Sequence, residues 1–179
     1  MGKVKTAGEK RAELIIKYRN LAVEKEDKDG DLRTYHLSRE GKKIIMHCLN
    51  DVKTIGIAYI RELKQIVDNE EAKKGIMVGD GKYTYSAKSS APKLSVELIP
   101  PTLPTFDIFE HNLVSKAHIV SEEEKKRLIE KYHAQPFQYP WMKSSDPIAI
   151  ILGAEASDVI YLTRKSETAG IAESYRYVV

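Results

Sequence analysis

The stretch KIIMHCL, residues 43–49, decides how the first half of the chain folds. Its run of apolar side chains predicts a buried strand. VKTIGIAYIRELKQIVD, residues 52–68, follows and places Ile60 and Leu63 on one helical stripe, with charges on the opposite face. GIMVG, residues 75–79, predicts a second buried strand. Because strand, helix and strand follow one another over short links, the sequence predicts a parallel βαβ unit.

The residues before this unit carry weaker signals. Helical spacing from Ala12 to Val23 predicts a helix, and the charge cluster EKEDKDGD predicts a solvent-exposed loop. The alternating aspartates of this cluster do not form an EF-hand loop. Gly30 falls between the second and third aspartate, and Ser38 stands where the bidentate glutamate belongs.

After the βαβ unit, GDGKYTYS contains a Gly-Lys pair that suggests a phosphate-binding loop. The Walker pattern fails, because Ile76 occupies the position of the first glycine and Tyr83 that of the Mg²⁺-binding hydroxyl. We interpret this segment as a turn. LIPPTLPTF then places three prolines in nine residues, which interrupts helices and inner strands alike. The sequence therefore predicts a domain boundary there, with domains 1–105 and 106–179.

The second domain has clear helix and strand signals. Ser121 and Glu124 form the pattern of a capping box, and Asp146-Pro147 places a cap and a proline at the start of a short helix that ends at Gly153. DVIYLTR and SYRYVV predict two paired strands at the end of the chain. The sequence predicts an α+β fold class: an N-terminal α/β domain that contains the βαβ unit, followed by a small C-terminal α+β domain.

Composition narrows the class of protein. Cys48 is the only cysteine, and no N-glycosylation sequon, membrane span or secretory signal is recognisable, so we expect an intracellular protein without disulfides. Residues 1–105 hold 20 Lys and Arg against 15 Asp and Glu, whereas residues 106–179 hold 9 against 11. The basic excess of the first domain is compatible with a position near nucleic acid and equally with an ordinary surface.

The residues needed for catalysis are not apparent. Ser166 is not on a nucleophile elbow, and no spacing ties it to the histidines of the same domain. Scattered histidines and one cysteine do not make a zinc site, and the strands of the βαβ unit carry no carboxylates for a two-metal nuclease. We expect no catalytic residues, no metal and no cofactor.

Several motifs of the second domain agree with a known family in order and spacing. They are EHNLV with Glu110, His111, Leu113 and Val114; SDPIAIILGA with Asp146, Pro147, Ala149 and Gly153; RKSETAG with Arg164, Ser166, Glu167, Thr168, Ala169 and Gly170; and the final Tyr175 and Arg176. This segment resembles the C-terminal domain of the fifth-largest common subunit of eukaryotic RNA polymerases I, II and III, a family that includes a shorter archaeal counterpart. VKTIGIAYI and SAK, upstream, resemble the N-terminal domain of the eukaryotic members.

The resemblance implies a non-catalytic subunit of DNA-dependent RNA polymerase. In that family the C-terminal domain is an assembly domain that anchors on the largest subunit, and the N-terminal domain forms part of the lower jaw beside downstream DNA. The implied subunit-interface residues are Glu110, His111, Asp146, Pro147, Arg164, Ser166, Glu167, Thr168, Ala169, Gly170, Tyr175 and Arg176. Because archaeal members lack the N-terminal domain, the resemblance implies a nuclear protein, or a cytoplasmic one in an archaeon or virus with a eukaryotic-like enzyme.

The sequence departs from the family at several positions. The proline and the second histidine expected after EHNLV are replaced by Ser115 and Ala117, and basic residues of the family become Trp141, Ile150 and Tyr161. Two alternatives stay open: a free-standing nucleic-acid-binding protein, and a small hydrolase or nuclease.

Overall fold

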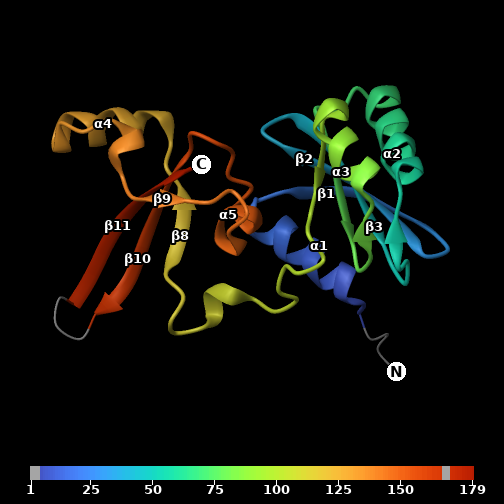
Figure 1. The fold of residues 1–179 in the computed structure, drawn as a ribbon, viewed down its shortest axis with the longest axis horizontal. Coiled ribbons are helices and arrows are strands. Elements are labelled where there is room, and N and C mark those ends of the chain that lie inside the picture. The colour runs from blue at the N-terminus through green and yellow to red at the C-terminus, as the bar shows by residue number, and fades with distance from the viewer. Residues whose placement is uncertain (1–4, 167–169) are drawn as a thin grey trace. The chain divides into compact units, whose positions relative to one another are not determined.

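The computed structural model describes residues 5–166 and 170–179. The chain divides into two compact units, one ending at Phe106 and one beginning at Asp107. We call them unit 1 and unit 2. The division falls one residue beyond the boundary expected from the prolines. Figure 1 shows the elements of both units.

Unit 1 is built around a five-stranded sheet with the strand order β1-β2-β3-β5-β7 (Figure 1). β1, β2 and β3 are antiparallel, and β3, β5 and β7 are parallel. The elements of unit 1, in chain order, are α1 (Ala7–Tyr18), β1 (Ala22–Asp29), β2 (Leu32–Arg39), β3 (Lys42–Leu49), β4 (Thr54–Ile55), α2 (Ile57–Asn69), β5 (Lys74–Gly79), β6 (Lys82–Tyr83), α3 (Tyr85–Ser90), the 3-10 helix η1 (Pro92–Leu94) and β7 (Val96–Leu98).

The two longer helices of unit 1 cover opposite faces of this sheet. In β3, Ile45 packs with the α2 residues Ile60 and Leu63, whereas a Cβ placed on Gly8 of α1 would lie 3.2 Å from the Cys48 sulfur. Since successive strand residues point to opposite faces, these contacts place α1 and α2 on different sides. The predicted strand–helix–strand unit is confirmed, with β3 and β5 parallel on either side of α2.

Two expectations for the first 31 residues were wrong. The first helix ends at Tyr18 rather than Val23, because Asn20 adopts a left-handed conformation with φ 51°. The charge cluster is not a loop: Ala22–Asp29 is β1, the edge strand of the sheet, and it turns at Gly30 into β2. Charged edge strands resist pairing with other chains, and this one lacks the apolar alternation by which strands are recognised.

The proline segment before Phe106 belongs to unit 1. Ile99 and Leu103 are buried, and the Tyr83 hydroxyl lies 2.9 Å from the Ile99 carbonyl oxygen. The Arg11 guanidinium donates a 2.7 Å hydrogen bond from Nε to the Leu103 carbonyl oxygen. The segment is therefore held against α1 and β6 rather than forming a free linker.

Unit 2 has a four-stranded sheet with the strand order β8-β10-β11-β9. β8, β10 and β11 are antiparallel, and β9 runs parallel to β11. Val120, Leu128 and Val159 form one buried cluster of its core, and four tyrosines pack against them: Tyr139, Tyr161, Tyr175 and Tyr177. The elements are η2 (Ile108–Glu110), β8 (Lys116–Ile119), α4 (Glu122–Tyr132), η3 (Pro136–Gln138), β9 (Trp141–Met142), α5 (Pro147–Leu152), β10 (Val159–Ser166) and β11 (Gly170–Val178).

The helix caps of unit 2 are those predicted from the sequence. Ser121 and Glu124 form the capping box of α4, and Asp146 caps α5, which begins with Pro147. α5 ends at Gly153, whose φ is 73°. No helix within the described residues has the length and apolar character to cross a membrane.

Candidate functional site

The C-terminal hairpin brings several of the predicted interface residues together. β10 and β11 pair without a register shift, with Arg164 opposite Ala172 and Ser166 opposite Gly170. Tyr175 and Arg176 lie on β11, opposite Tyr161 and Ile160. The expected interface residues Glu167, Thr168 and Ala169 lie outside the described residues.

The other predicted interface residues lie in two separate turns. The Asp146 carboxylate accepts a 2.8 Å hydrogen bond from the Ile148 amide, so it serves as the cap of α5. Glu110 and His111 lie at the end of η2, where His111 Nδ1 accepts a hydrogen bond from the Leu113 amide at 3.2 Å. Asp146 and His111 therefore make hydrogen bonds within their own turns, and the role of these residues in subunit contacts stays a prediction.

A tyrosine cluster covers one face of the unit 2 sheet. The Tyr175 ring lies 5.3 Å from Tyr161, 5.9 Å from Tyr139 and 6.2 Å from Tyr132, measured between ring centres. Burial raises the pKa of the Tyr175 and Tyr139 hydroxyls, so both stay protonated near neutral pH. The sequence analysis missed this cluster, although Tyr161 and Tyr175 lie directly opposite each other on the paired strands β10 and β11.

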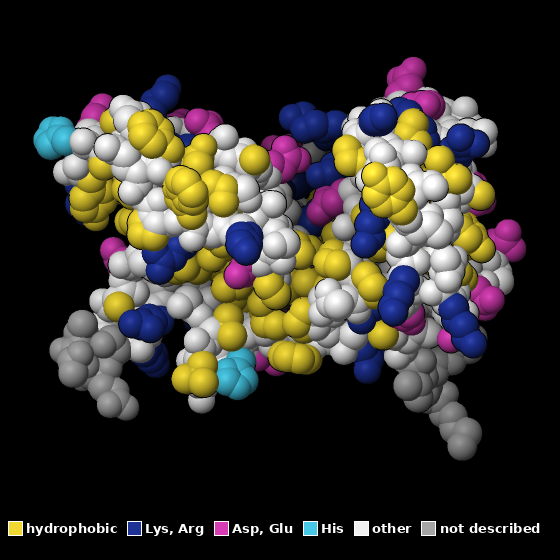
Figure 2. Space-filling model, viewed as in Figure 1, with side chains coloured by type: hydrophobic (Ala, Val, Ile, Leu, Met, Phe, Trp, Pro, Cys, Tyr) yellow, Lys and Arg dark blue, Asp and Glu magenta, His cyan; other side chains and the backbone are white. Residues whose placement is uncertain are grey.

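Beside this cluster two aromatic side chains are exposed. Trp141 of β9 is 70% exposed and Phe137 of η3 is 60% exposed. The Trp141 indole donates a hydrogen bond to the Phe137 carbonyl oxygen at 3.2 Å, which fixes the two residues relative to each other. Figure 2 shows hydrophobic side chains gathered over the part of unit 2 where α4 and β9 lie. We call Phe137 and Trp141 the aromatic pair.

The strands of unit 1 carry little that could perform catalysis. β2, β3 and β5 contain no aspartate or glutamate. Burial lowers the pKa of His47 to about 4 and raises the pKa of the Cys48 thiol to about 12, so neither is a base or nucleophile poised near pH 7. No group of three metal-ligating side chains occurs within residues 5–166 and 170–179.

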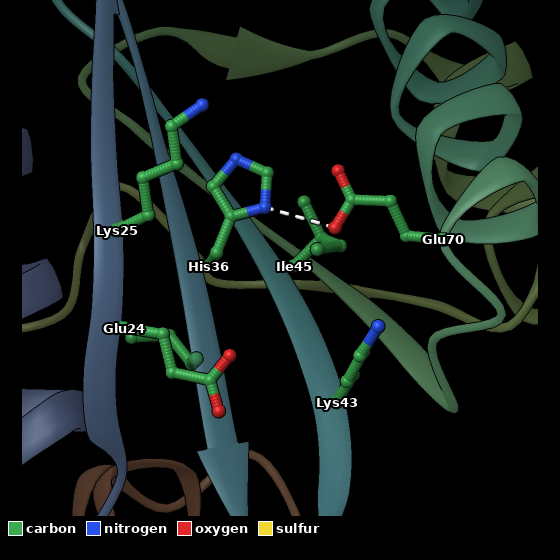
Figure 3. Close-up of a pocket in the computed structure, with 7 residues that line it drawn as sticks. Glu24, Lys25, His36, Lys43, Ile45 and Glu70 are labelled. Carbon is green, nitrogen blue, oxygen red and sulfur yellow. Dashed lines mark hydrogen bonds and ion pairs between the residues drawn. The ribbon is translucent and has the colours of Figure 1, made fainter.

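A small hollow lies on the α2 side of the sheet, near its charged edge (Figure 3). His36 on β2 points toward Glu70, which follows α2, with Nδ1 and Oε2 2.9 Å apart, and its Nε2 lies 3.1 Å from Asp27. The hollow is about 140 Å³, less than ligand pockets usually enclose. The histidine with its two carboxylates therefore ties β1, β2 and the end of α2 together.

Lysines gather where the parallel strands of unit 1 end. The loops after β3 and β5 are joined backbone to backbone, because the Lys82 amide donates to the Lys53 carbonyl oxygen at 3.1 Å. Lys53, Lys82 and Lys88 are exposed, and Tyr85 is 87% exposed. We call these four residues the lysine–tyrosine surface. Asp80, in the same loops, is paired with Arg11 at 2.9 Å.

The comparisons with known proteins match the two units to different families. Residues 106–178 match the family model for the RNA polymerase Rpb5 C-terminal domain. The DNA-directed RNA polymerase subunit Rpo5 of Pyrococcus abyssi is 53% identical over 74 residues, which are 41% of this chain and 90% of that protein. The chain belongs to the Rpb5 family of RNA polymerase subunits. The Rpo5 subunit of Sulfolobus acidocaldarius is 42% identical over 73 residues, 41% of this chain and 87% of that subunit.

The family expected from the sequence motifs is thereby confirmed, and so is the expectation of an RNA polymerase subunit. The expected nuclear location receives no support, because the Rpo5 relatives are archaeal; they agree with the archaeal alternative.

Unit 1 matches a family that the sequence reading did not name. Residues 11–102, half of the chain, match the family model Mrr_cat, described as a restriction endonuclease, and unit 1 belongs to that family. A solved structure titled "Structure of EndoMS in apo form" is 18% identical with a TM-score of 0.40, covering 56% of this chain and 47% of that one. Helices and strands occur together in both units, so the fold class is mixed α and β throughout.

Proposed function

We propose that unit 2 anchors this chain on the largest subunit of an RNA polymerase, and that unit 1 lies beside the DNA ahead of the enzyme as part of a jaw. The observation that carries the first part is the length of the Rpo5 relatives. The aligned 74 residues make up 90% of the Pyrococcus abyssi protein, so a unit of this size is by itself a polymerase subunit. The expected interface residues of the hairpin and the two turns belong to this unit.

The lysine–tyrosine surface supports the DNA contact of unit 1. Lys53 and Lys82 stand on two segments that a backbone hydrogen bond joins, and Lys88 stands on α3, which follows. All three lysines are exposed, and a DNA backbone attracts such a cluster through its phosphates. Tyr85 follows Thr84, whose hydroxyl caps α3. The ends of β3 and β5 thus present a basic surface with one exposed aromatic side chain.

Crosslinking within the assembled enzyme tests this placement. With photo-reactive groups in the downstream DNA, labels should fall on unit 1 and should decrease when Lys53, Lys82 and Lys88 are changed to glutamine. Lys42, Lys43 and Lys73 lie at the opposite end of the same strands and provide a matched control triple. Labels confined to residues 107–179 would contradict the proposal.

Nuclease activity is the second candidate, and the restriction endonuclease match of unit 1 favours it. The central strands argue against it, because metal-dependent nucleases hold their ions with carboxylates and β2, β3 and β5 have none. We therefore infer a non-catalytic role for unit 1. Incubation of the chain with supercoiled plasmid and Mg²⁺ or Mn²⁺ should leave the plasmid intact; nicking that co-purifies with the chain and is lost in an Asp80→Asn variant would reverse this inference.

A further inference from the structure

The outer edge of β11 is open along most of its length. β11 runs from Gly170 to Val178, and β9 pairs with its last two residues alone, Tyr177 and Val178. Within the described residues, no other strand pairs with this edge. Figure 1 draws β11 as the outermost long strand of the unit 2 sheet.

The direction of the backbone groups follows from the hydrogen bonds at the end of β11. The Val178 amide donates to the backbone carbonyl oxygen of Asp158, on the β10 side, at 2.9 Å, whereas the Tyr177 amide donates to the Pro140 carbonyl oxygen at 3.0 Å. The β10–β11 register is unbroken, so the alternation continues along the strand. The amide and carbonyl groups of Ile171, Glu173 and Tyr175 therefore point away from β10.

A proline ends the pairing of β9 with β11. In a parallel ladder, the residue that accepts from the Tyr177 amide would donate its own amide to the Tyr175 carbonyl. That residue is Pro140, which has no N–H, so the ladder stops there. Because Pro140 ends the pairing with β9, the open edge of β11 extends from Tyr175 back to Gly170.

This edge lacks several of the features that protect sheet edges, although it carries one exposed charged residue, Glu173. Single-chain proteins shield an exposed edge with proline, inward-pointing charges, bulges or short strands. β11 has nine residues, contains no proline and pairs with β10 without a bulge. Ile171, on the open part, is 68% exposed. Such an edge is a template for a further strand.

We propose that the open edge of β11, from Gly170 to Tyr175, takes up an extended segment of a neighbouring RNA polymerase subunit as a fifth strand. The main-chain groups of Ile171, Glu173 and Tyr175 supply the hydrogen bonds, repeating at about 7 Å along the edge. Cross-strand pairing calls for an apolar residue beside Ile171 and a basic residue beside Glu173. This inference rests on the incorporation into a polymerase proposed above.

The aromatic pair extends this surface beyond the strand. η3, which carries Phe137, packs against β11, and Trp141 stands opposite Tyr177 at the end of the open edge. Exposed aromatic side chains of this kind anchor partners at interfaces. An added strand would reach them as it leaves the edge, which gives the segment both main-chain hydrogen bonds and an apolar anchor.

Hydrogen exchange measured by NMR on selectively labelled chain tests the proposal. In the free chain the amides of Ile171, Glu173 and Tyr175 should exchange fast, and those of Ala172 and Ser174 slowly. In a polymerase reconstituted with the labelled chain, the first three amides should slow by at least tenfold, roughly the effect of one hydrogen bond. Unchanged exchange at these three amides in an assembled enzyme would overturn the added strand and leave incorporation standing.

Proline substitutions provide a second, independent readout. Glu173→Pro removes an outward-pointing amide and should leave the free chain folded, since edge positions tolerate proline. It should nevertheless reduce incorporation by roughly tenfold or more, the effect of one lost hydrogen bond, relative to Glu173→Gln, which keeps the amide. Ser174→Pro removes an amide that faces β10 and should unfold the hairpin.

The outcomes separate the two levels of inference. Equal incorporation of Glu173→Pro and Glu173→Gln would overturn the added strand alone. Failure of the unaltered chain to enter the polymerase would overturn the proposed function and the added strand with it. Concentration-dependent protection of the same amides in the free chain would assign the edge to a second copy of this chain and would also overturn the proposal.

Discussion

His47 is a buried polar residue that the fold uses as an apolar one. Its side chain is 1% exposed in the middle of β3, and Nε2 has no hydrogen-bond partner within the described residues. Burial, aided by the charge of His36, lowers the pKa of His47 to about 4 from the usual 6.5. Between pH 6.5 and about 4, His47 is therefore protonated in the unfolded chain and neutral in the folded chain. Because the unfolded chain binds more protons, unit 1 should lose stability as the pH falls through this range.

A leucine in place of His47 should flatten this pH dependence. At pH 7 the unfolding free energies of the variant and the unaltered chain should differ by no more than about 1.5 kcal/mol, because the two side chains have similar volumes. Near pH 4.5 it should be the more stable by up to about 2–3 kcal/mol. Calorimetric unfolding across this range measures the difference. His111→Gln, at an exposed position of unit 2, is the control; parallel curves for His47→Leu and the unaltered chain would refute the explanation.

Gly170, the first residue of β11, adopts a backbone conformation that favours glycine. Its φ is 70°, and a Cβ placed there would meet nothing within 4 Å. Gly170→Val should cost about 1–3 kcal/mol of unfolding free energy, the scale of strain for a side chain in the left-handed region. Gly170→Asn should cost less, because asparagine tolerates that region. Equal melting temperatures for the two variants would show that the backbone at position 170 accepts a side chain without strain.

At the level of elements, the loops after β3 and β5 depend on a close approach at Gly81. A Cβ on Gly81 would lie 2.1 Å from the Val52 carbonyl oxygen, so one loop must move if this residue gains a side chain. Gly81→Ala should lower the unfolding free energy of unit 1 by roughly 2 kcal/mol or more. It should also separate Lys53 from Lys82 and weaken DNA crosslinking.

Gly56→Ala is the matched control for this substitution. Gly56 precedes α2 in the same region, and a Cβ there would meet nothing within 4 Å. Alanine at this helix cap should cost no more than about 1 kcal/mol. A similar loss of stability in the two variants, measured by thermal unfolding, would contradict the close-approach argument.

The sequence predicted those elements whose local signals coincide with burial. β3, α2 and β5 carry continuous or one-sided apolar patterns, and α4 and α5 carry caps, so all five were placed to within a few residues. β1 was not predicted as a strand, because an exposed edge strand can be charged along its whole length. β9 was not predicted either, because a strand of two residues beside Pro140 is too short to show alternating hydrophobicity. Its pairing depends on the position of β11 in the folded chain.

The candidate site divides in the same way. The hairpin and the cap of α5 were predicted because turn and cap chemistry is local. The lysine–tyrosine surface and the open edge of β11 were not predicted, because each depends on contacts between segments far apart in the sequence, such as Lys53 with Lys82. The restriction endonuclease family of unit 1 was not predicted either, because β2, β3 and β5 lack the carboxylates by which a metal-dependent nuclease is recognised.

At the scale of the whole molecule, the chain joins a unit that resembles complete archaeal subunits to a unit that those relatives do not cover. The Rpo5 proteins align with 41% of this chain, and the aligned residues are 90% of the Pyrococcus abyssi protein. Assembly into the polymerase should therefore need unit 2 alone. Residues 107–179, expressed separately, should enter a polymerase that lacks this subunit as readily as the full chain does.

The same experiment assigns a role to unit 1 by difference. Polymerase carrying residues 107–179 should bind downstream DNA with a weaker dependence on salt than polymerase carrying the full chain. If the three lysines of the lysine–tyrosine surface each contact a phosphate, the logarithmic salt slope should differ by up to about 3. The Lys53, Lys82 and Lys88 triple glutamine variant should reproduce most of that difference within the full chain, whereas the Lys42, Lys43 and Lys73 control should not. An equal salt slope with and without unit 1 would contradict the proposed position of this unit beside DNA. Loss of a basic surface that contacts DNA reduces the number of counterions released on binding, and the salt slope would have to become smaller.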